Sequence, residues 1–98
     1  MKNFLKPSIA LALLICVSNP AFAGCYADYK AKRDNPLRLH YGVIELSDAA
    51  CRAPARAKSE ISTHLARENW QLLNVISVFD DDGLKKRQKS AGKYFLRY

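Results

Sequence analysis

The sequence predicts an α+β domain with the element order β-α-β-β, in which one helix packs on a three-stranded sheet, behind an N-terminal signal peptide. Three observations support this prediction. The first 23 residues have the layout of a secretory signal, three later segments have strand-like patterns, and one segment repeats apolar residues every four positions. A chain of 98 residues has room for one domain, and its 49% hydrophobic and 26% charged residues are typical of globular proteins.

The segment 1–23 has the three parts of a signal peptide. Lys2 and Lys6 precede the apolar run 9–17, Pro20 then interrupts the helix, and small residues precede the expected cut after Ala23. The apolar run is shorter than the roughly 20 residues that a transmembrane helix needs. We therefore expect a periplasmic or secreted protein without a transmembrane span in its mature chain.

The cysteines favour a disulfide in the mature chain. Cys16 leaves with the signal, so Cys25 and Cys51 remain, and in an oxidising compartment such a pair is expected to form a bond. Closing a loop of about 25 residues is worth roughly 3.5 kcal/mol in the chain-entropy treatment. The alternative is a lipoprotein anchored through Cys25. Gly24-Cys25 fits the end of a lipobox, but Phe22 stands where leucine is usual.

The first half of the mature chain is predicted to supply an extension, a strand and the helix. Residues 24–36 are polar and are expected to form an N-terminal extension tethered by the disulfide, which Asn35-Pro36 ends in a turn. Residues 37–46 alternate between apolar and polar side chains, as the first strand of a domain spanning 37–98 would. The helix is expected over 54–69, with an apolar stripe formed by Ala57, Ile61 and Leu65.

The second half is predicted to supply two more strands. Residues 70–79 are nearly apolar on both faces and are expected to form a central strand, joined to the first by a parallel crossover. Trp70, between the helix and this strand, is the expected core anchor. The basic segment 84–91 follows a loop and forms at most two helical turns. The alternating segment 93–98 is predicted to return as a third strand, antiparallel to the second.

A resemblance adds to this reading. The segments "HYGVIEL" and "LARENWQLLNVISVF", followed by a short aromatic strand, resemble small bacterial exported domains of unknown function over residues 40–98. In that family a tryptophan follows the helix, usually after a glycine. Asn69 occupies the glycine position here, and asparagine tolerates the left-handed conformation that ends a helix. The resemblance implies a fold of this type and assigns no reaction, ligand or catalytic residue.

The sequence carries no strong motif for catalysis or metal binding. His40 and His64 are 24 positions apart and lack the short spacing of metal ligands. The acidic run Asp80-Asp81-Asp82-Gly83 is consecutive, whereas calcium loops alternate their ligands, so a solvated turn is favoured. We therefore expect no cofactor, metal or small-molecule substrate, and an enzyme is the less favoured interpretation.

The charge distribution suggests a partner. Removing residues 1–23 leaves 14 basic and 9 acidic residues, a net charge of +5, which favours anionic partners. The candidate contact patch consists of Lys85, Lys86, Arg87, Lys89, Lys93 and Arg97. Such a run is also typical of a solvated loop.

The resulting hypothesis is a non-enzymatic binding or structural module that recognises an envelope protein or an anionic envelope component. A basic nucleic-acid-binding domain and a small redox factor remain as alternatives. The export signal argues against nucleic acid as the partner. The distance of Cys25 from Cys51 is unlike the C-x-x-C spacing of redox pairs.

The intact mass of the exported protein tests the processing prediction. We expect a chain that begins at Gly24, because small residues lie at the positions that signal peptidase reads. The measurement is mass spectrometry of the protein released by the cells. A diacylglyceryl group on Cys25 would contradict this expectation and would replace the soluble form with a lipid-anchored one.

Overall fold

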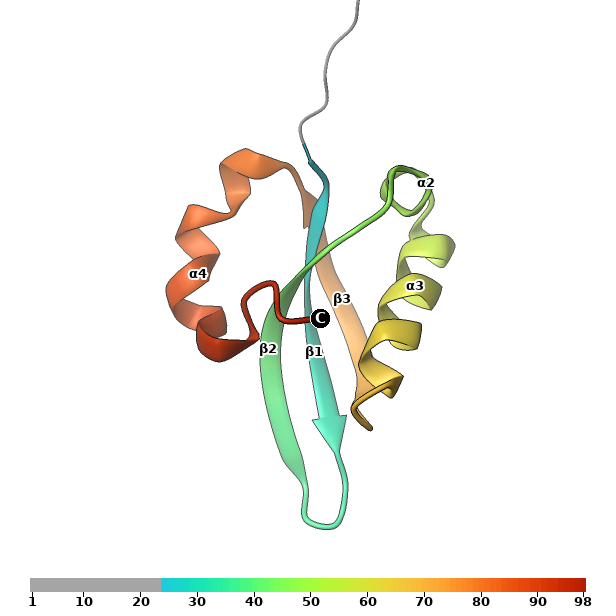
Figure 1. Cartoon of the computed structure of the whole chain (residues 1–98), viewed down its shortest axis with the longest axis vertical. Helices are drawn as coiled ribbons and strands as arrows, with labels where there is room; N and C mark the ends of the chain where they lie inside the picture. Colours follow the sequence, from blue (N-terminus) through green and yellow to red (C-terminus); the bar gives the residue numbers. More distant parts are fainter. Residues whose placement is uncertain (1–23) are drawn as a thin grey trace, which may run out of the picture.

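The computed structural model describes residues 24–98, so the predicted signal peptide lies outside the described residues. The α+β class is confirmed, because helices pack on a three-stranded antiparallel sheet (Figure 1). The elements are, in chain order, β1 (Tyr26–Arg33), β2 (Arg38–Glu45), α2 (Asp48–Cys51), α3 (Pro54–Ala66), β3 (Gln71–Phe79), the 3₁₀ turn η2 (Asp81–Gly83), α4 (Lys85–Ala91) and the 3₁₀ turn η3 (Gly92–Tyr94). Along the chain, the strands and the main helix thus follow in the order β-β-α-β, which differs from the predicted β-α-β-β.

The prediction of an N-terminal extension over 24–36 is wrong, because this segment forms the central strand. The sheet order is β2-β1-β3, and β1 pairs antiparallel with both neighbours. Ala27, Tyr29 and Ala31 are fully buried in the core, while Asp28 and Lys30 point the other way. The buried face thus consists of small alanines around one tyrosine, which makes the alternation hard to see among the charged residues.

The prediction that 70–79 is a central strand is also wrong. β3 pairs only with β1, and β1 separates it from β2, so no parallel pair of neighbours forms. Two shifts in its register leave Leu73 and Ile76 without a partner residue in β1. These bulges turn both side chains toward the solvent, where each is 46% exposed. The apolar run therefore reflects an edge strand with two displaced residues rather than burial on both faces.

The predicted third strand over 93–98 is a 3₁₀ turn followed by a short extended tail. Gly92 and Leu96 have positive φ angles of 54° and 56°, and these interrupt a continuous extended run. Only one bridge to β2 forms, in which the backbone N–H of Leu96 donates to the carbonyl of Val43 over 2.8 Å. The tail thus lies against the outer edge of β2 instead of pairing with β3.

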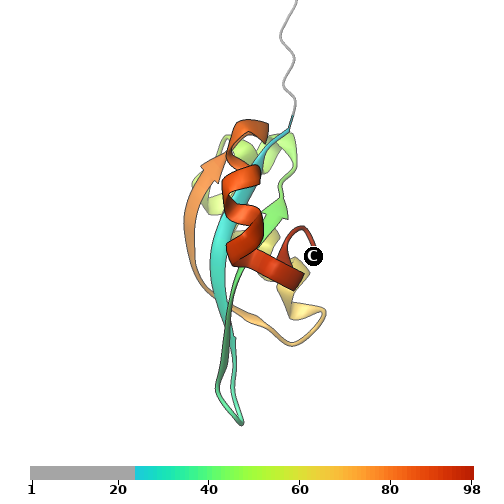
Figure 2. The same ribbon diagram turned by 90° about the vertical axis from the view of Figure 1, so that its left-hand side faces the viewer.

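The helices cover the two sides of the sheet. α3 lies on one side and α4 on the other in two perpendicular views (Figures 1 and 2). The predicted stripe of α3 is confirmed, since Ala57, Ile61 and Leu65 are buried against the sheet. α3 begins at Pro54, where the missing N–H of proline costs no hydrogen bond.

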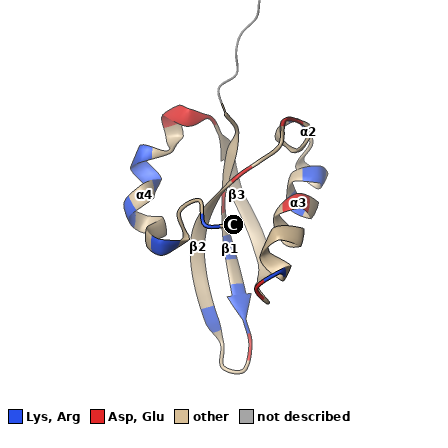
Figure 3. Cartoon of the chain, viewed as in Figure 1, with Lys and Arg blue, Asp and Glu red and all other residues tan. Residues whose placement is uncertain are grey.

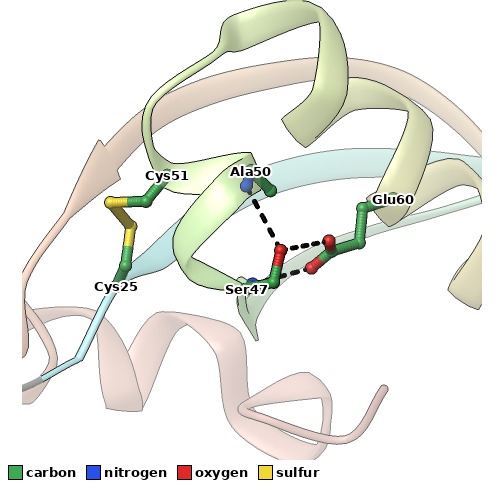
Figure 4. Close-up of a disulfide and its surroundings, with 5 residues drawn as sticks. All are labelled: Cys25, Ser47, Ala50, Cys51 and Glu60. Carbon is green, nitrogen blue, oxygen red and sulfur yellow. Dashed lines mark hydrogen bonds between the residues drawn. A yellow bond between two sulfur atoms is a disulfide. The ribbon is translucent and has the colours of Figure 1, made fainter.

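The predicted disulfide between Cys25 and Cys51 is formed, and it ties the start of β1 to the end of α2 (Figure 4). Ser47 caps α2 by accepting a hydrogen bond from the N–H of Ala50. Glu60 of α3 accepts hydrogen bonds from the backbone N–H and the hydroxyl of the same Ser47, at 2.9 and 2.7 Å. The disulfide and this carboxylate together fix the corner between α2 and α3.

A buried ion pair attaches α4 to the sheet. The carboxylate of Asp28 accepts hydrogen bonds from Arg87 at 3.0 Å, Tyr41 at 2.8 Å and Ser77 at 2.7 Å. Burial raises the pKa of Asp28, but these three donors outweigh it, so that its pKa lies below the ordinary value. Arg87 also donates to the carbonyl of Gly83 and stacks on Phe79, 3.9 Å from the ring centre. Arg87 is therefore a structural residue, contrary to its prediction as part of a solvated patch.

Replacing Arg87 with alanine should destabilise the fold by about 3 kcal/mol, because it leaves the carboxylate of Asp28 buried without its cation. The matched variant Lys86→Ala, at an exposed position of the same helix, should change the free energy of unfolding by less than about 0.5 kcal/mol. Urea denaturation of both variants measures the difference. Equal midpoints for the two variants would show that the ion pair does not hold α4.

Candidate anion-binding site

His40 is the centre of a cluster of aromatic side chains. Its Nε2 atom lies 2.9 Å from the hydroxyl of Tyr29, and its ring packs perpendicular to that of Trp70 with ring centres 4.3 Å apart. Tyr94 stacks on the imidazole with ring centres 3.8 Å apart, and Tyr98 lies beyond at 6.0 Å. The four aromatic residues come from β1, the approach to β3 and the C-terminal tail, so the cluster joins three segments distant in sequence.

Gly42 makes room for this cluster. The ring of Tyr29 in β1 crosses directly over Gly42 of β2 to reach His40. A side chain at position 42 would collide with the hydroxyl group of Tyr29. Glycine is therefore required here for close packing.

His40 is neutral at physiological pH. It is 7% exposed, and burial, together with the positive charge of Arg33, lowers its pKa to about 4. Its Nδ1 atom has no hydrogen-bond partner among the described residues. Burial also raises the pKa of Tyr29, so the pair remains an uncharged hydrogen bond. His40 is therefore a packed core residue, and not a base that faces solvent.

A pocket of about 180 Å³ lies beside this cluster, and we call it the Trp70 pocket. Aromatic side chains, one carboxylate and four cationic side chains line it: Trp70, Tyr94, Tyr98, Glu68, Arg33, Arg38, Lys93 and Arg97. Arg33 ends β1 and Arg38 begins β2, where the two residues are directly paired across the hairpin. Lys93 and Arg97 come from the C-terminal segment. In Figure 3 the ribbon is coloured for basic residues on β1 and β2 toward the hairpin end, and for others along α4.

Two of the four cations are held in place by Glu68. The guanidinium of Arg33 stacks on Trp70, 4.1 Å from the ring centre, and donates to the backbone carbonyl of Glu68 at 2.6 and 3.2 Å. Arg97 lies 3.8 Å from the Glu68 carboxylate. Within residues 24–98, neither Arg38 nor Lys93 forms an ion pair. The pocket thus has more positive charge than its single carboxylate neutralises.

Such a pocket is suited to bind an anion. Guanidinium groups recognise carboxylate and phosphate through paired hydrogen bonds. In this pocket Arg33 lies over the ring of Trp70 and Arg97 over the ring of Tyr98, in cation–π geometry. Within residues 24–98, no group of three or more histidine, cysteine or acidic side chains could hold a metal ion. His64, on α3, contacts Arg67 rather than the His40 cluster.

The structure divides the predicted patch into three parts. Lys93 and Arg97 reach the Trp70 pocket, Lys85, Lys86 and Lys89 are exposed on α4, and Arg87 is bound to Asp28.

Sequence reasoning missed Arg33 and Arg38. The signal that could have found them is the turn at Asn35-Pro36, because reading it as a hairpin turn places residues 33 and 38 opposite each other. The acidic run 80–83 forms η2, capped by Asp80.

Comparison of the chain with protein-family models, curated proteins and solved structures finds no significant match. The resemblance to small bacterial exported domains therefore stays a prediction. Among the helices of residues 24–98, none is both long enough and apolar enough to cross a membrane.

The buried His40 should make stability depend on pH. Its pKa is about 4 when folded and 6.5 when unfolded, so the unfolded chain binds the extra proton as the pH falls through this window. Stability should therefore be complete above about pH 6.5 and lower by about 2 kcal/mol at about pH 5. Denaturant midpoints at these two pH values measure the loss.

The variant His40→Gln keeps a hydrogen-bonding side chain without an ionisable group, and it should remove most of this pH dependence. The matched variant His64→Gln should retain it. If His40→Gln loses as much stability as the wild type between the two pH values, another group causes the effect.

Proposed function

We propose that this chain is a small exported binding module, without enzymatic activity, that holds an anionic group of an envelope component in the Trp70 pocket. The observation that carries the proposal is the gathering of four cations around one small pocket with a single carboxylate. Like charges repel, and bringing them together costs free energy unless a negative group joins them. A ligand that supplies this negative charge would relieve the repulsion.

The dimensions and chemistry of the pocket favour a phosphate or carboxylate group. A volume of about 180 Å³ is smaller than the roughly 300–1,000 Å³ of pockets for drug-sized ligands, so it suits one charged group of a larger partner. Arg38 and Lys93 are exposed and have no acidic partner within residues 24–98, and they are the cations free to contact this group. Arg33 stacks on Trp70 and donates to the Glu68 carbonyl, so it forms a fixed part of the pocket lining next to these two cations.

The surroundings of the histidine and the cysteines support a binding role over the alternatives. His40 is covered by Tyr94 and hydrogen-bonded to Tyr29, so its imidazole does not face a ligand as a base. Cys25 is buried in the core and bonded to Cys51, an arrangement typical of a structural disulfide rather than a redox pair. The disulfide also agrees with an oxidising compartment, which export would provide.

Binding of inorganic polyphosphate, followed through tryptophan fluorescence, tests the proposal. Trp70 is the only tryptophan of the chain and lines the pocket, so its emission should change as the probe binds. The double variant Arg38→Gln/Lys93→Gln should bind at least about tenfold more weakly, because each charge-assisted hydrogen bond is worth about 1.5–3 kcal/mol. Affinity should fall as salt rises, since both cations are exposed.

The matched control is Lys85→Gln/Lys86→Gln, which removes the same charge from exposed positions on α4. It should bind polyphosphate nearly as well as the wild type. Equal losses in both double variants would mean that net charge alone governs binding. A loss only in the α4 variant would move the site to the lysines of that helix and would refute the proposal.

A further inference from the structure

The end of the β1–β2 hairpin exposes large apolar side chains. Leu37, the last residue of the turn, is 64% exposed, and Leu39 in β2 is 65% exposed. They are the two most exposed large hydrophobic residues among residues 24–98. The hairpin end projects beyond the rest of the sheet in both views (Figures 1 and 2). An apolar tip on a projecting element is unlike the scattered apolar residues of an ordinary surface.

A shallow apolar depression extends the tip along one face of the sheet. Its volume is about 260 Å³, and its lining includes Leu39, Leu73 and Tyr41. Leu73 is turned toward the solvent by one of the two bulges of β3. Lys30 borders the same depression. The apolar surface is therefore continuous from the tip toward the start of β3.

Cations surround this apolar tip. Lys30, Lys32, Arg33 and Arg38 lie on the two strands near the turn, against the single carboxylate of Asp34, which pairs with Lys32 at 3.3 Å. Arg33 and Arg38 also line the Trp70 pocket, and Leu39 follows Arg38 directly. Because neighbouring residues of a strand point to opposite faces, Arg38 and the Trp70 pocket lie on one face of the hairpin end and Leu39 on the other. The two faces of the hairpin end together form the candidate surface.

We propose that this surface docks on an anionic lipid bilayer, an inference that rests on the proposed function and names the source of its anion. Leu37 and Leu39 enter the boundary between headgroups and acyl chains, while the cations contact headgroup phosphates. A phosphate of one lipid occupies the Trp70 pocket. The tip leucines supply apolar insertion and the cations supply attraction, the two contributions that a peripheral protein needs to bind a charged membrane.

The charge pattern favours a bilayer over a protein partner. A protein interface has a core depleted of charge, with its polar residues at the rim. Here two leucines project between cations on a narrow hairpin. The interface of an anionic membrane offers apolar depth and negative charge together over a whole plane, so a projecting tip and the cations around it are satisfied at once.

Co-sedimentation with vesicles tests the inference, using the full chain in the form that the expressing cells release. The vesicles contain phosphatidylcholine with or without 30% phosphatidylglycerol. The wild type should sediment with the anionic vesicles and not with the neutral ones. Leu37→Ser/Leu39→Ser should reduce partitioning about tenfold or more, because burial of one leucine is worth at least about a factor of ten.

The matched control is Ile76→Ser, which removes a large side chain of 46% exposure from another part of β3. It should bind the anionic vesicles as the wild type does, and thermal melts verify that both variants are folded. As a second measurement, Leu37→Trp should be quenched by brominated lipids more strongly than the wild type is through Trp70 alone.

The outcomes separate the two proposals. Absence of wild-type binding to anionic vesicles, or equal binding by the double leucine variant, overturns the bilayer inference, whereas pocket-dependent polyphosphate binding would still support the proposed function. If the vesicles bind but Arg38→Gln/Lys93→Gln affects neither vesicles nor polyphosphate, the pocket function fails, and with it the placement of a lipid phosphate there. Equal binding to neutral vesicles overturns the requirement for an anionic lipid.

Discussion

The position of β1 between two antiparallel neighbours is the constraint on which the rest of the structure depends. Its alternate residues serve different layers: Tyr29 packs beneath α3 and reaches His40, while Asp28 faces α4 and binds Arg87. The disulfide fixes the residue immediately before the strand. One strand of eight residues therefore connects the helix layer, the sheet, α4 and the hairpin, which is why a polar-looking segment is central to the fold.

The cationic pocket follows from this arrangement. β1 carries Arg33 to the hairpin end, and the antiparallel register brings Arg38 opposite it. The aromatic cluster around His40 provides a platform on which Tyr94 and Tyr98 stack, and this places the C-terminal cations at the same opening. Arg33 stays beside the other cations of the pocket, despite their repulsion, because it donates to the carbonyl of Glu68 and stacks on the indole ring of Trp70. The Trp70 pocket thus combines cations at the ends of two paired strands with cations of a C-terminal segment that packs on the buried aromatic cluster.

The sequence predicted what depends on local pattern and missed what depends on distant partners. The stripe of α3 and its start at Pro54 follow from helical periodicity and from proline chemistry. The cysteine pairing follows from the two cysteines that remain once the predicted signal peptide is set aside. β1 was missed because alanines carry its buried face. Arg87 was assigned to solvent because its partner, Asp28, lies 59 positions away in sequence. The pocket joins residues from both ends of the domain, and no local pattern links Arg33 to Arg97.

The bulges of β3 also bear on whether another strand can add to the sheet. The tail covers the outer edge of β2 at one point, where the N–H of Leu96 donates to the carbonyl of Val43. The edge of β3 is unpaired in the described chain and carries neither proline nor a charged residue. Such an edge would normally template the addition of another strand. The two unpaired residues, Leu73 and Ile76, break the regular spacing of its backbone groups at two points. An incoming chain would therefore find no long uninterrupted ladder, so this irregular geometry acts against strand addition in the way that lysine or proline does on other edge strands.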